Sequence, residues 1–240
     1  MRYLVTAYYW VVFLTTSTVG FCLASVLFLF TAPFDPARRA FTRFVMTWSH
    51  CYVRIWPLWR VRVLHRERIP AGPCVIVVNH QSAADALAVM GLQLTYKFVA
   101  KASLFKLPIV GWLMRMMQFI PLERGRPHST SDMFDGCRKW LRAGLPVLIF
   151  PEGTYSGGKR LLPFKRGAFL LAMEEKVPLV PVVLTGTPEL IDGDGPLMST
   201  RANIAVDVQA PLWPESFPAT DEALATQVRA QFAQALGQSV

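Results

Sequence analysis

Apolar residues follow two different patterns along the 240-residue chain. The run from Tyr3 to Phe30 is predominantly apolar and carries no charged residue. At ~1.5 Å of rise per residue, a helix of this length can cross a ~30 Å hydrocarbon layer. From residue 61 onwards, short β-branched runs alternate with longer segments of helical period, which is typical of an α/β domain. We therefore expect a membrane-anchoring helical segment over residues 1–60 and an α/β domain over residues 61–240.

The second part of the chain is predicted to form a mixed sheet covered by helices. Two of its runs, CVIVV and VLIF, are continuously apolar, which favours central strands buried on both faces. The predicted strands are Val61–His65, Cys74–Val78, Tyr96–Ala100, Gln118–Leu122, Val147–Phe150, Leu179–Leu184 and Asn203–Gln209. The predicted helices cover residues 83–93, 104–116, 130–143, 166–175 and 221–237.

Prolines end the N-terminal apolar run, and arginines and aromatic residues follow it. Residues 37–60 mix both types, a composition suited to the headgroup region of a membrane; a core helix with a basic solvent face is the alternative. Arginines after the run indicate that this side lies in the cytoplasm, so we expect the protein at the cytoplasmic face of the inner membrane. The run can cross once or fold back as a hairpin, and Gly20 near its middle permits either.

Composition narrows the possible partners. The sequence has 25 Lys and Arg residues against 16 Asp and Glu, a net charge of +9, and a mean hydropathy of +0.33. A basic and apolar chain suits an anionic membrane or phosphorylated substrates. No nucleic-acid recognition motif is present, so we expect no nucleic-acid partner. The four cysteines form no Cys-x-x-Cys pair and have apolar neighbours, so we interpret them as structural thiols in a reducing compartment.

One segment brings a histidine and a carboxylate to the end of a predicted strand. If Ser82 caps the helix that follows, Asp85 is its third residue, from which an acidic side chain reaches back towards the cap. That reach would bring the Asp85 carboxylate close to His80. A neutral imidazole can take the proton of a hydroxyl that attacks a carbonyl, and a carboxylate on the other ring nitrogen fixes the tautomer. Taken alone, the spacing fits a capped helix beside an unrelated histidine equally well.

Together with three further blocks, this segment resembles the glycerolipid acyltransferase family typified by lysophosphatidic acid acyltransferases. The resemblance covers roughly residues 60–210. The blocks are Asn79–Asp85, Phe119–Arg124, Phe150–Ser156 and Val177–Val183, with a Pro-Phe-Lys-Arg-Gly segment at Pro163–Gly167. The resemblance implies transfer of a fatty acyl group from acyl-CoA or acyl-carrier protein to a lysophospholipid hydroxyl, first of all 1-acylglycerol-3-phosphate, giving phosphatidic acid. It also implies that no metal, no cofactor and no covalent acyl-enzyme are needed.

The resemblance assigns roles to individual residues. His80 is expected to be the general base and Asp85 its orienting partner, and Arg124 is expected to face a headgroup phosphate. Glu152 could accept a glycerol hydroxyl, hold a basic residue or only shape its turn. The expected substrate-binding residues are Arg124, Glu152, Gly153, Thr154, Lys165 and Arg166. The last two are predicted at a helix start, where backbone N–H groups favour anions; they either hold phosphate or are solvated charges.

One position departs from the family pattern. The family usually has arginine after Glu-Gly-Thr, and here the residue is Tyr155. A neutral phenol cannot replace an arginine at a phosphate site. Either Lys159, Arg160 or Arg166 compensates, or the acceptor carries another headgroup, as lyso-ornithine lipid does.

Two alternative functions and the role of one apolar segment stay open. A lipid hydrolase could use the same histidine, although no Gly-x-Ser-x-Gly motif is present. A non-catalytic membrane-binding module could retain the fold, although the pair of His80 and Asp85 argues against it. The apolar segment Leu104–Met117 could line a groove for the acyl chain, dip into the membrane interface, or form a buried core helix.

Overall fold

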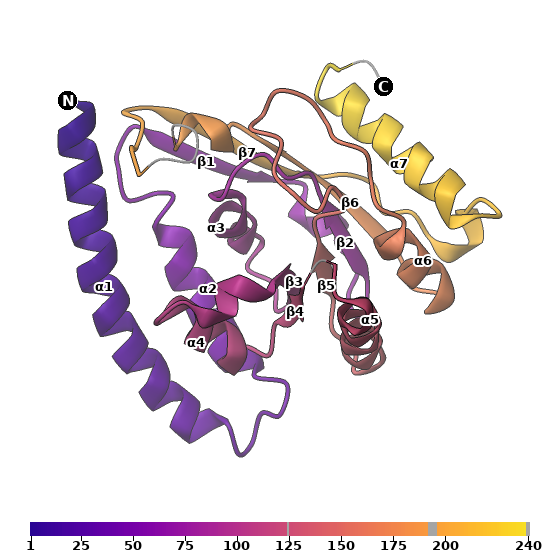
Figure 1. Ribbon diagram of the computed structural model, residues 1–240, viewed down its shortest axis with the longest axis horizontal. Coiled ribbons are helices and arrows are strands. Elements are labelled where there is room, and N and C mark those ends of the chain that lie inside the picture. The colour runs from indigo at the N-terminus through magenta and orange to yellow at the C-terminus, as the bar shows by residue number, and fades with distance from the viewer. Residues whose placement is uncertain (124, 192–195, 239–240) are drawn as a thin grey trace.

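The computed structural model describes residues 1–123, 125–191 and 196–238. Seven strands form one sheet in the order β1-β7-β6-β2-β5-β3-β4 (Figure 1). The strands are β1 (Trp59–Leu64), β2 (Val75–Val78), β3 (Lys97–Lys101), β4 (Ile120–Leu122), β5 (Val147–Ile149), β6 (Leu179–Thr185) and β7 (Ala202–Val208). Each predicted strand is present, and its ends differ from the prediction by no more than two residues.

The sheet is mixed, as the sequence predicts. Strands β6, β2, β5, β3 and β4 run parallel, β7 is antiparallel to β6, and β1 pairs in parallel with β7. The carboxyl ends of the five parallel strands therefore meet at one edge, where open α/β sheets place their ligand sites. At this edge the side-chain amide of Asn79 donates a hydrogen bond to the carbonyl of Leu184 (2.9 Å) and accepts one from its N–H (2.7 Å). This pair of bonds fixes the end of β2 against β6.

Helices cover both faces of the sheet. They are α1 (Arg2–Thr31), α2 (Arg39–Cys51), α3 (Asp85–Val89), α4 (Val110–Met116), α5 (Pro127–Arg142), α6 (Gly167–Glu174) and α7 (Asp221–Ala235). Helices α1 to α4 lie on one face and α5 to α7 on the other, each group with its own buried core (Figure 1). The predicted fold class, an α/β sheet covered by helices and preceded by a long apolar helix, is confirmed.

The apolar N-terminal run forms the single helix α1, and α2 packs back against it. At Gly20, near the middle of α1, an added Cβ atom would lie 2.3 Å from the ring of Trp48 on α2. The hairpin therefore forms between α1 and α2, and not within the apolar run. Gly20 lets the two helices approach closely, a role that differs from the bend predicted as one possibility.

The first 60 residues do not form a core of their own. Val5 and Tyr9 of α1 and Phe41 of α2 are buried in the same cluster as Ile76 of β2 and Leu148 of β5. The predicted boundary at residue 60 therefore falls within one continuous core. Most of α1 nevertheless faces outwards, because only 17% of the most apolar 18-residue window of this helix is buried. Among the described residues, α1 is the one helix long and apolar enough to cross a membrane by length and composition.

Two predicted helices are shorter than expected. The predicted helix 104–116 is split into a 3-10 helix, η3 (Ala102–Lys106), and α4. Pro108 lies between them, and a proline disfavours helical geometry at the residue before it. The predicted helix 83–93 is α3 followed by a 3-10 helix, η2 (Met90–Leu92). It begins at Asp85 and not near Ser82, because the Ser82 hydroxyl accepts the N–H of Ala84 (3.2 Å) and forms a local turn.

Candidate active site

His80 and Asp85 form a hydrogen-bonded pair at the carboxyl edge of the sheet. His80 lies two residues beyond β2, and its Nδ1 atom is 2.7 Å from Oδ2 of Asp85. The Asp85 side chain is fully buried, whereas 20% of the His80 side chain is exposed. Because a carboxylate accepts hydrogen bonds, Nδ1 carries the hydrogen and Nε2 keeps its lone pair. Within the described parts of the chain, no residue hydrogen bonds to Nε2, so this atom is available to a substrate hydroxyl.

The Asp85 carboxylate is held by further donors. Its Oδ2 atom accepts the backbone N–H groups of Gln81 (2.6 Å) and Ser82 (2.9 Å). Its Oδ1 atom accepts the hydroxyl of Thr187, which lies directly after β6. The reach of Asp85 back to Ser82 is the contact that the sequence predicts, although the helix itself begins later. Donors on both oxygens fix the carboxylate that orients the imidazole.

A second loop, after β5, fixes the backbone of His80. Oε1 of Glu152 accepts the backbone N–H of His80 (2.7 Å), and Oε2 accepts the N–H of Leu162 (2.9 Å). The N–H of Ser156 donates to the carbonyl of His80 (2.8 Å). Glu152 is 4% exposed, and burial raises its pKa while the two backbone donors oppose that rise. Contact between Glu152 and a substrate hydroxyl is therefore not supported. Glu152 shapes its turn, which is one of the alternatives for this residue, and it also holds the backbone of His80.

Two aromatic rings confine the imidazole of His80. The ring of Phe150 stacks on it with centroids 4.1 Å apart and planes 9° from parallel. The ring of Tyr155 approaches edge-on, with centroids 5.8 Å apart. The imidazole therefore has little freedom to tilt, and its Nε2 atom keeps one direction. Tyr155, which occupies the position of the usual family arginine, thus lies against His80, the predicted general base.

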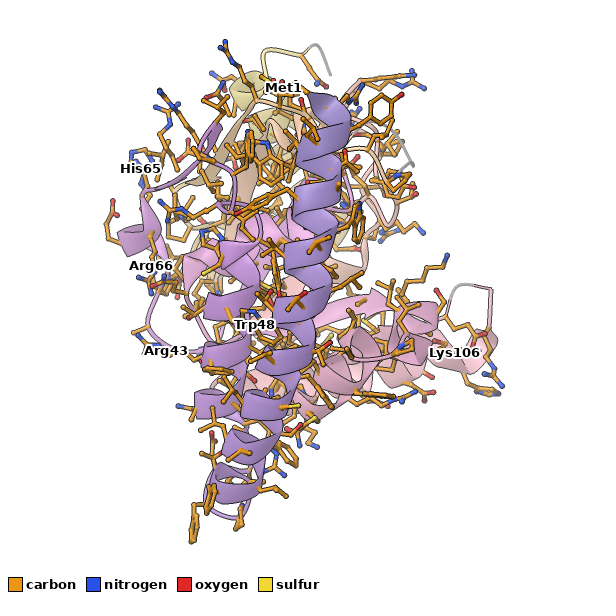
Figure 2. The ribbon with its side chains drawn as sticks, turned by 90° about the vertical axis from the view of Figure 1, so that its left-hand side faces the viewer. Met1, Arg43, Trp48, His65, Arg66 and Lys106 are labelled. Carbon is orange, nitrogen blue, oxygen red and sulfur yellow. The ribbon has the colours of Figure 1, made fainter. Side chains whose placement is uncertain are left out.

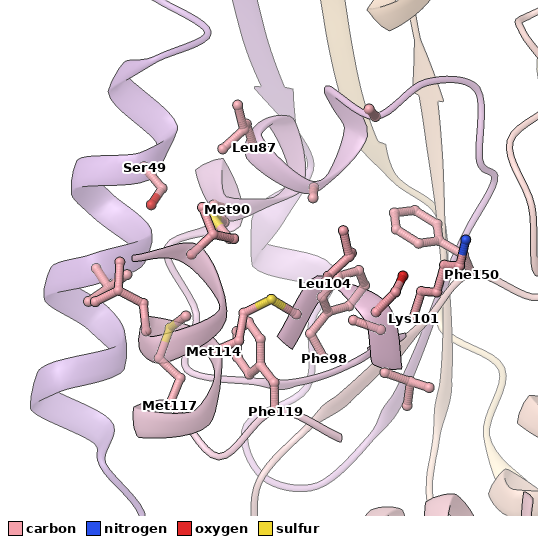
Figure 3. Close-up of a pocket in the computed structure, with 18 of the residues that line it drawn as sticks. Ser49, Leu87, Met90, Phe98, Lys101, Leu104, Met114, Met117, Phe119 and Phe150 are labelled. Carbon is pink, nitrogen blue, oxygen red and sulfur yellow. The ribbon is translucent and has the colours of Figure 1, made fainter. Parts of the chain in front are cut away.

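An apolar cavity of about 570 Å³ begins at His80. Its wall is formed by residues of α1, α2, α3, β3, η3 and α4 and of the loop after β5 (Figure 3). Apart from His80, Lys101 supplies the one charged side chain among the described lining residues. An apolar cavity that ends at a polar, reactive group is what a fatty acyl chain requires. Lining residues that Figure 3 labels include Leu87, Met90, Phe98, Met114, Met117 and Phe119.

The segment Leu104–Met117 contributes to this cavity and to the surface. Leu113 and Met114 line the cavity and are buried, whereas Leu107 is 46% and Trp112 46% exposed. Trp112 also contacts Phe21 of α1, with ring centroids 5.4 Å apart. The segment is therefore partly a groove wall and partly an exposed apolar surface continuous with α1.

Two of the predicted substrate-binding residues line the cavity, and a third lies against one of them. Gly153 and Thr154 line it beside Tyr155. Gly153 has φ +70°, which favours glycine, and an added Cβ atom would lie 3.0 Å from Nζ of Lys165. The Lys165 side chain therefore lies against the Gly153 turn.

The other predicted cations are placed differently. Arg166 forms a two-pronged ion pair with Asp221 at the start of α7, with N···O distances of 2.7 and 2.6 Å. This ion pair joins the start of α6 to the start of α7, and the role of Arg166 as a phosphate ligand stays a prediction. Lys159 and Arg160 line a separate cleft beside α7. Arg124 lies outside the described residues.

Sequence reasoning missed some residues of the site. Thr187 is 102 positions from Asp85, and no pattern in the sequence links the two. Phe150 and Asn79 lie inside the recognised blocks, yet their roles as a stacking partner and a strand clamp depend on contacts that a motif does not show. The position of Phe150 at the end of a central parallel strand, next to the loop of His80, is the one signal that could have identified it.

Comparison with known proteins identifies the family of this chain. Residues 60–185 match the family described as Acyltransferase. The chain is 35% identical to a chloroplastic 1-acyl-sn-glycerol-3-phosphate acyltransferase of Brassica napus over 187 residues, which is 77% of this chain and 54% of that protein. It is 32% identical to the 1-acyl-sn-glycerol-3-phosphate acyltransferase of Pseudomonas aeruginosa over 71% of this chain and 67% of that protein. The chain spans about half the length of the chloroplastic relatives.

A solved structure supports the fold. The crystal structure of the 1-acyl-sn-glycerophosphate acyltransferase PlsC from Thermotoga maritima superposes with a TM-score of 0.77 over 98% of this chain and 95% of that one, at 24% identity. The fold and the four sequence blocks thus agree with the family match. The chain belongs to the glycerolipid acyltransferase family, which the 1-acyl-sn-glycerol-3-phosphate acyltransferases typify.

Proposed function

We propose that the protein transfers a fatty acyl group from a thioester donor to the free hydroxyl of 1-acylglycerol-3-phosphate, giving phosphatidic acid. The observation that carries this proposal is the position of His80, whose Nε2 atom is available at the end of an apolar cavity while Asp85 holds Nδ1. The names of the relatives point to the same acceptor. The donor is acyl-CoA or acyl-carrier protein, and no cofactor takes part in the proposed reaction.

The proposed reaction uses two proton transfers, which the geometry of His80 and Asp85 supports. Nε2 of His80 takes the proton of the acceptor hydroxyl as its oxygen attacks the thioester carbonyl. The Asp85 carboxylate stabilises the imidazolium that forms. When the tetrahedral intermediate collapses, the carbon–sulfur bond breaks and the thiolate takes the proton back from Nε2. The ester is formed, the carrier thiol is released and His80 returns to its starting state.

We also propose that the protein acts at a membrane, at the cytoplasmic face of the inner membrane. The outer side of α1 exposes large apolar side chains along its whole length (Figure 2). Trp112 and Leu107 extend this surface beyond α1. Arg43 and Lys106 lie on either side of α1 in the same view, where cations could meet lipid phosphates. A lysolipid could then reach the cavity, which also touches Phe13 of α1, without leaving the membrane.

The acceptor headgroup has one specific competitor. Because Tyr155 takes the place of the family arginine, a lyso-aminolipid such as lyso-ornithine lipid remains a second candidate. Lys165, at the Gly153 turn, is one described cation that could serve a phosphate acceptor in place of that arginine, and Lys101, which lines the cavity, is another.

A panel of acceptors tests the proposal. The protein, purified in detergent, is given labelled acyl-CoA or acyl-carrier protein together with 1-acylglycerol-3-phosphate, other lysophospholipids or lyso-ornithine lipid. We expect phosphatidic acid as the main product and product formation that depends on the acceptor. Release of free fatty acid without an acceptor would indicate a hydrolase instead, and no turnover with any acceptor would indicate a non-catalytic module.

A further inference from the structure

A second cleft, beside α7, is lined by three cations. Lys159 and Arg160 come from the loop between β5 and α6, and Arg229 comes from α7. The remaining lining residues are Leu161, Pro163, Gly237 and Gln238. No carboxylate occurs among the described residues of this lining. The cleft therefore carries a concentrated positive charge that the described parts of the fold do not neutralise.

Arg229 differs from the other arginines on this face of the sheet. Its Nε atom is buried and has no hydrogen-bond partner among the described residues. By contrast, Arg138 pairs with Glu174, and Arg142 pairs with Glu175. A buried donor without a partner is costly, and among the described residues the guanidinium of Arg229 lacks the carboxylate partner that Arg138 and Arg142 have. The cleft thus has the charge and the hydrogen-bond donor that an anionic ligand needs.

The cleft is directly connected to the loop that holds His80. The N–H of Ser156 donates to the carbonyl of His80, and the N–H of Leu161 donates to Oε1 of Gln238 (2.7 Å). Lys159 lies between these two anchors. Three residues span at most about 11 Å of extended chain, so Lys159 lies close to Ser156 and hence to the active site. A ligand with a long arm could place phosphates in the cleft and its reactive end at His80.

The position of the cleft in the fold indicates which class of anionic ligand it could bind. Helix α7, which supplies Arg229 to the cleft, lies on the face of the sheet opposite α1 (Figure 1). If the apolar side of α1 faces the membrane, the cleft faces water and is remote from lipid headgroups. A concave site lined by a few cations suits a small multiply phosphorylated molecule better than a protein surface.

We propose that this cleft binds the phosphates of the nucleotide part of acyl-CoA, and so holds the donor while its thioester reaches His80. The inference rests on the proposed acyl transfer, because it assigns the donor of that reaction. In this arrangement Arg229 and Arg160 donate bidentate hydrogen bonds to phosphate oxygens, and Lys159 adds positive charge to the cleft. The adenosine 3′-phosphate and the diphosphate of the donor supply the matching negative charge.

Binding of an acyl-free probe tests the site independently of turnover. Adenosine 3′,5′-bisphosphate is titrated calorimetrically into the detergent-purified full chain. The variants are Lys159→Gln, Arg160→Gln and Arg229→Gln, singly and together, with Arg201→Gln as a control because Arg201 is an exposed arginine remote in sequence from the cleft. We expect the triple variant to bind at least about tenfold more weakly, since several charge-assisted contacts are lost. The control and His80→Ala should bind as the wild type does.

Kinetics with the same variants separates the possible ligands. The triple variant should raise KM for acyl-CoA about tenfold or more, with KM for the lysolipid and kcat nearly unchanged. A thioester of dephospho-CoA should lose less affinity than acyl-CoA in the triple variant. Unchanged probe binding in the triple variant would overturn the inference. A change confined to KM for the lysolipid, or to acyl-carrier protein as donor, would overturn it as well.

The two proposals can fail separately. If the wild type forms phosphatidic acid but does not bind the probe, the cleft inference fails and the acyltransferase proposal stands. If the probe binds and the triple variant loses it while no acceptor is acylated, the nucleotide site is supported and the proposed function fails.

Discussion

The buried carboxylate of Asp85 joins two segments that lie far apart in the chain. One oxygen accepts Nδ1–H of His80 at 2.7 Å, and the other accepts the hydroxyl of Thr187 from the residues after β6. With the backbone N–H groups of Gln81 and Ser82, four donors hold it. The direction of Nε2 of His80 is therefore set by the packing of β6 against β2 as well as by the local motif.

Replacing Thr187 by valine tests this relationship. The variant keeps the branched shape and removes the hydroxyl, so the carboxylate that orients His80 loses one donor. A hydrogen bond to a charged group contributes about 1.5–3 kcal/mol, and we expect kcat to fall about tenfold with both KM values nearly unchanged. Thr187→Ser should restore most of kcat. Wild-type kcat in Thr187→Val would show that the hydroxyl does not position the pair.

The apolar cavity predicts a limit on acyl-chain length. Met114 is buried in its wall, so Met114→Trp should shorten the space available to the chain. Each methylene that no longer fits loses about 0.8 kcal/mol of burial, and kcat/KM should shift towards shorter acyl donors. Leu107→Trp is the matched control, because Leu107 is 46% exposed and lies in the same segment. An equal shift in the control, or none in Met114→Trp, would mean that the chain binds elsewhere.

The contact between Gly20 and Trp48 predicts an unusual sign for a helical substitution. Glycine to alanine within a helix normally stabilises by up to about 1 kcal/mol. Here the added methyl group would meet the Trp48 ring at 2.3 Å, and such overpacking costs about 1–3 kcal/mol. Gly20→Ala should therefore lower the Tm measured in detergent, whereas Val19→Ala on the exposed side of α1 should change it little. A Tm above that of the wild type would contradict close packing of α1 against α2.

Lys97 predicts how stability depends on pH at the alkaline end. The residue is fully buried, and its Nζ atom donates to the carbonyls of Ala37 (2.8 Å) and Met117 (2.7 Å). Burial lowers the pKa of Lys97 from 10.5 to about 8, although nearby Asp35 opposes this. Between these two values the unfolded chain binds more protons than the folded protein, so the contribution of Lys97 to stability rises with pH.

The comparison variant for this prediction is Lys97→Met, which cannot titrate. The free energy of unfolding is measured by urea in detergent across the interval from about pH 8 to 10.5. The free energy of unfolding of the wild type minus that of the variant should increase as the pH rises. Parallel pH dependences would show that Lys97 does not titrate differently in the folded protein.

The features that could be predicted from the sequence are those that local patterns encode. The continuously apolar run in β2 and the alternation of strands and helices can be recognised from residues that are adjacent in the sequence. These patterns were enough to predict the sheet. The reach of Asp85 to the backbone of Ser82 spans three residues and was predictable from capping chemistry. The pairing of Arg166 with Asp221 depends on how α6 packs against α7, and nothing in the local sequence distinguishes this arginine from a phosphate ligand.

The central claim is that His80 acts as the general base of acyl transfer. The most direct measurement is the rate of phosphatidic acid formation from acyl-CoA and 1-acylglycerol-3-phosphate by the wild type and His80→Ala. The Tm of both proteins is measured alongside, to check that the variant is folded. Loss of a general base costs about 10²–10⁴-fold, and we expect kcat to fall within this range while the variant remains folded. Equal rates of product formation by the two proteins would contradict the account.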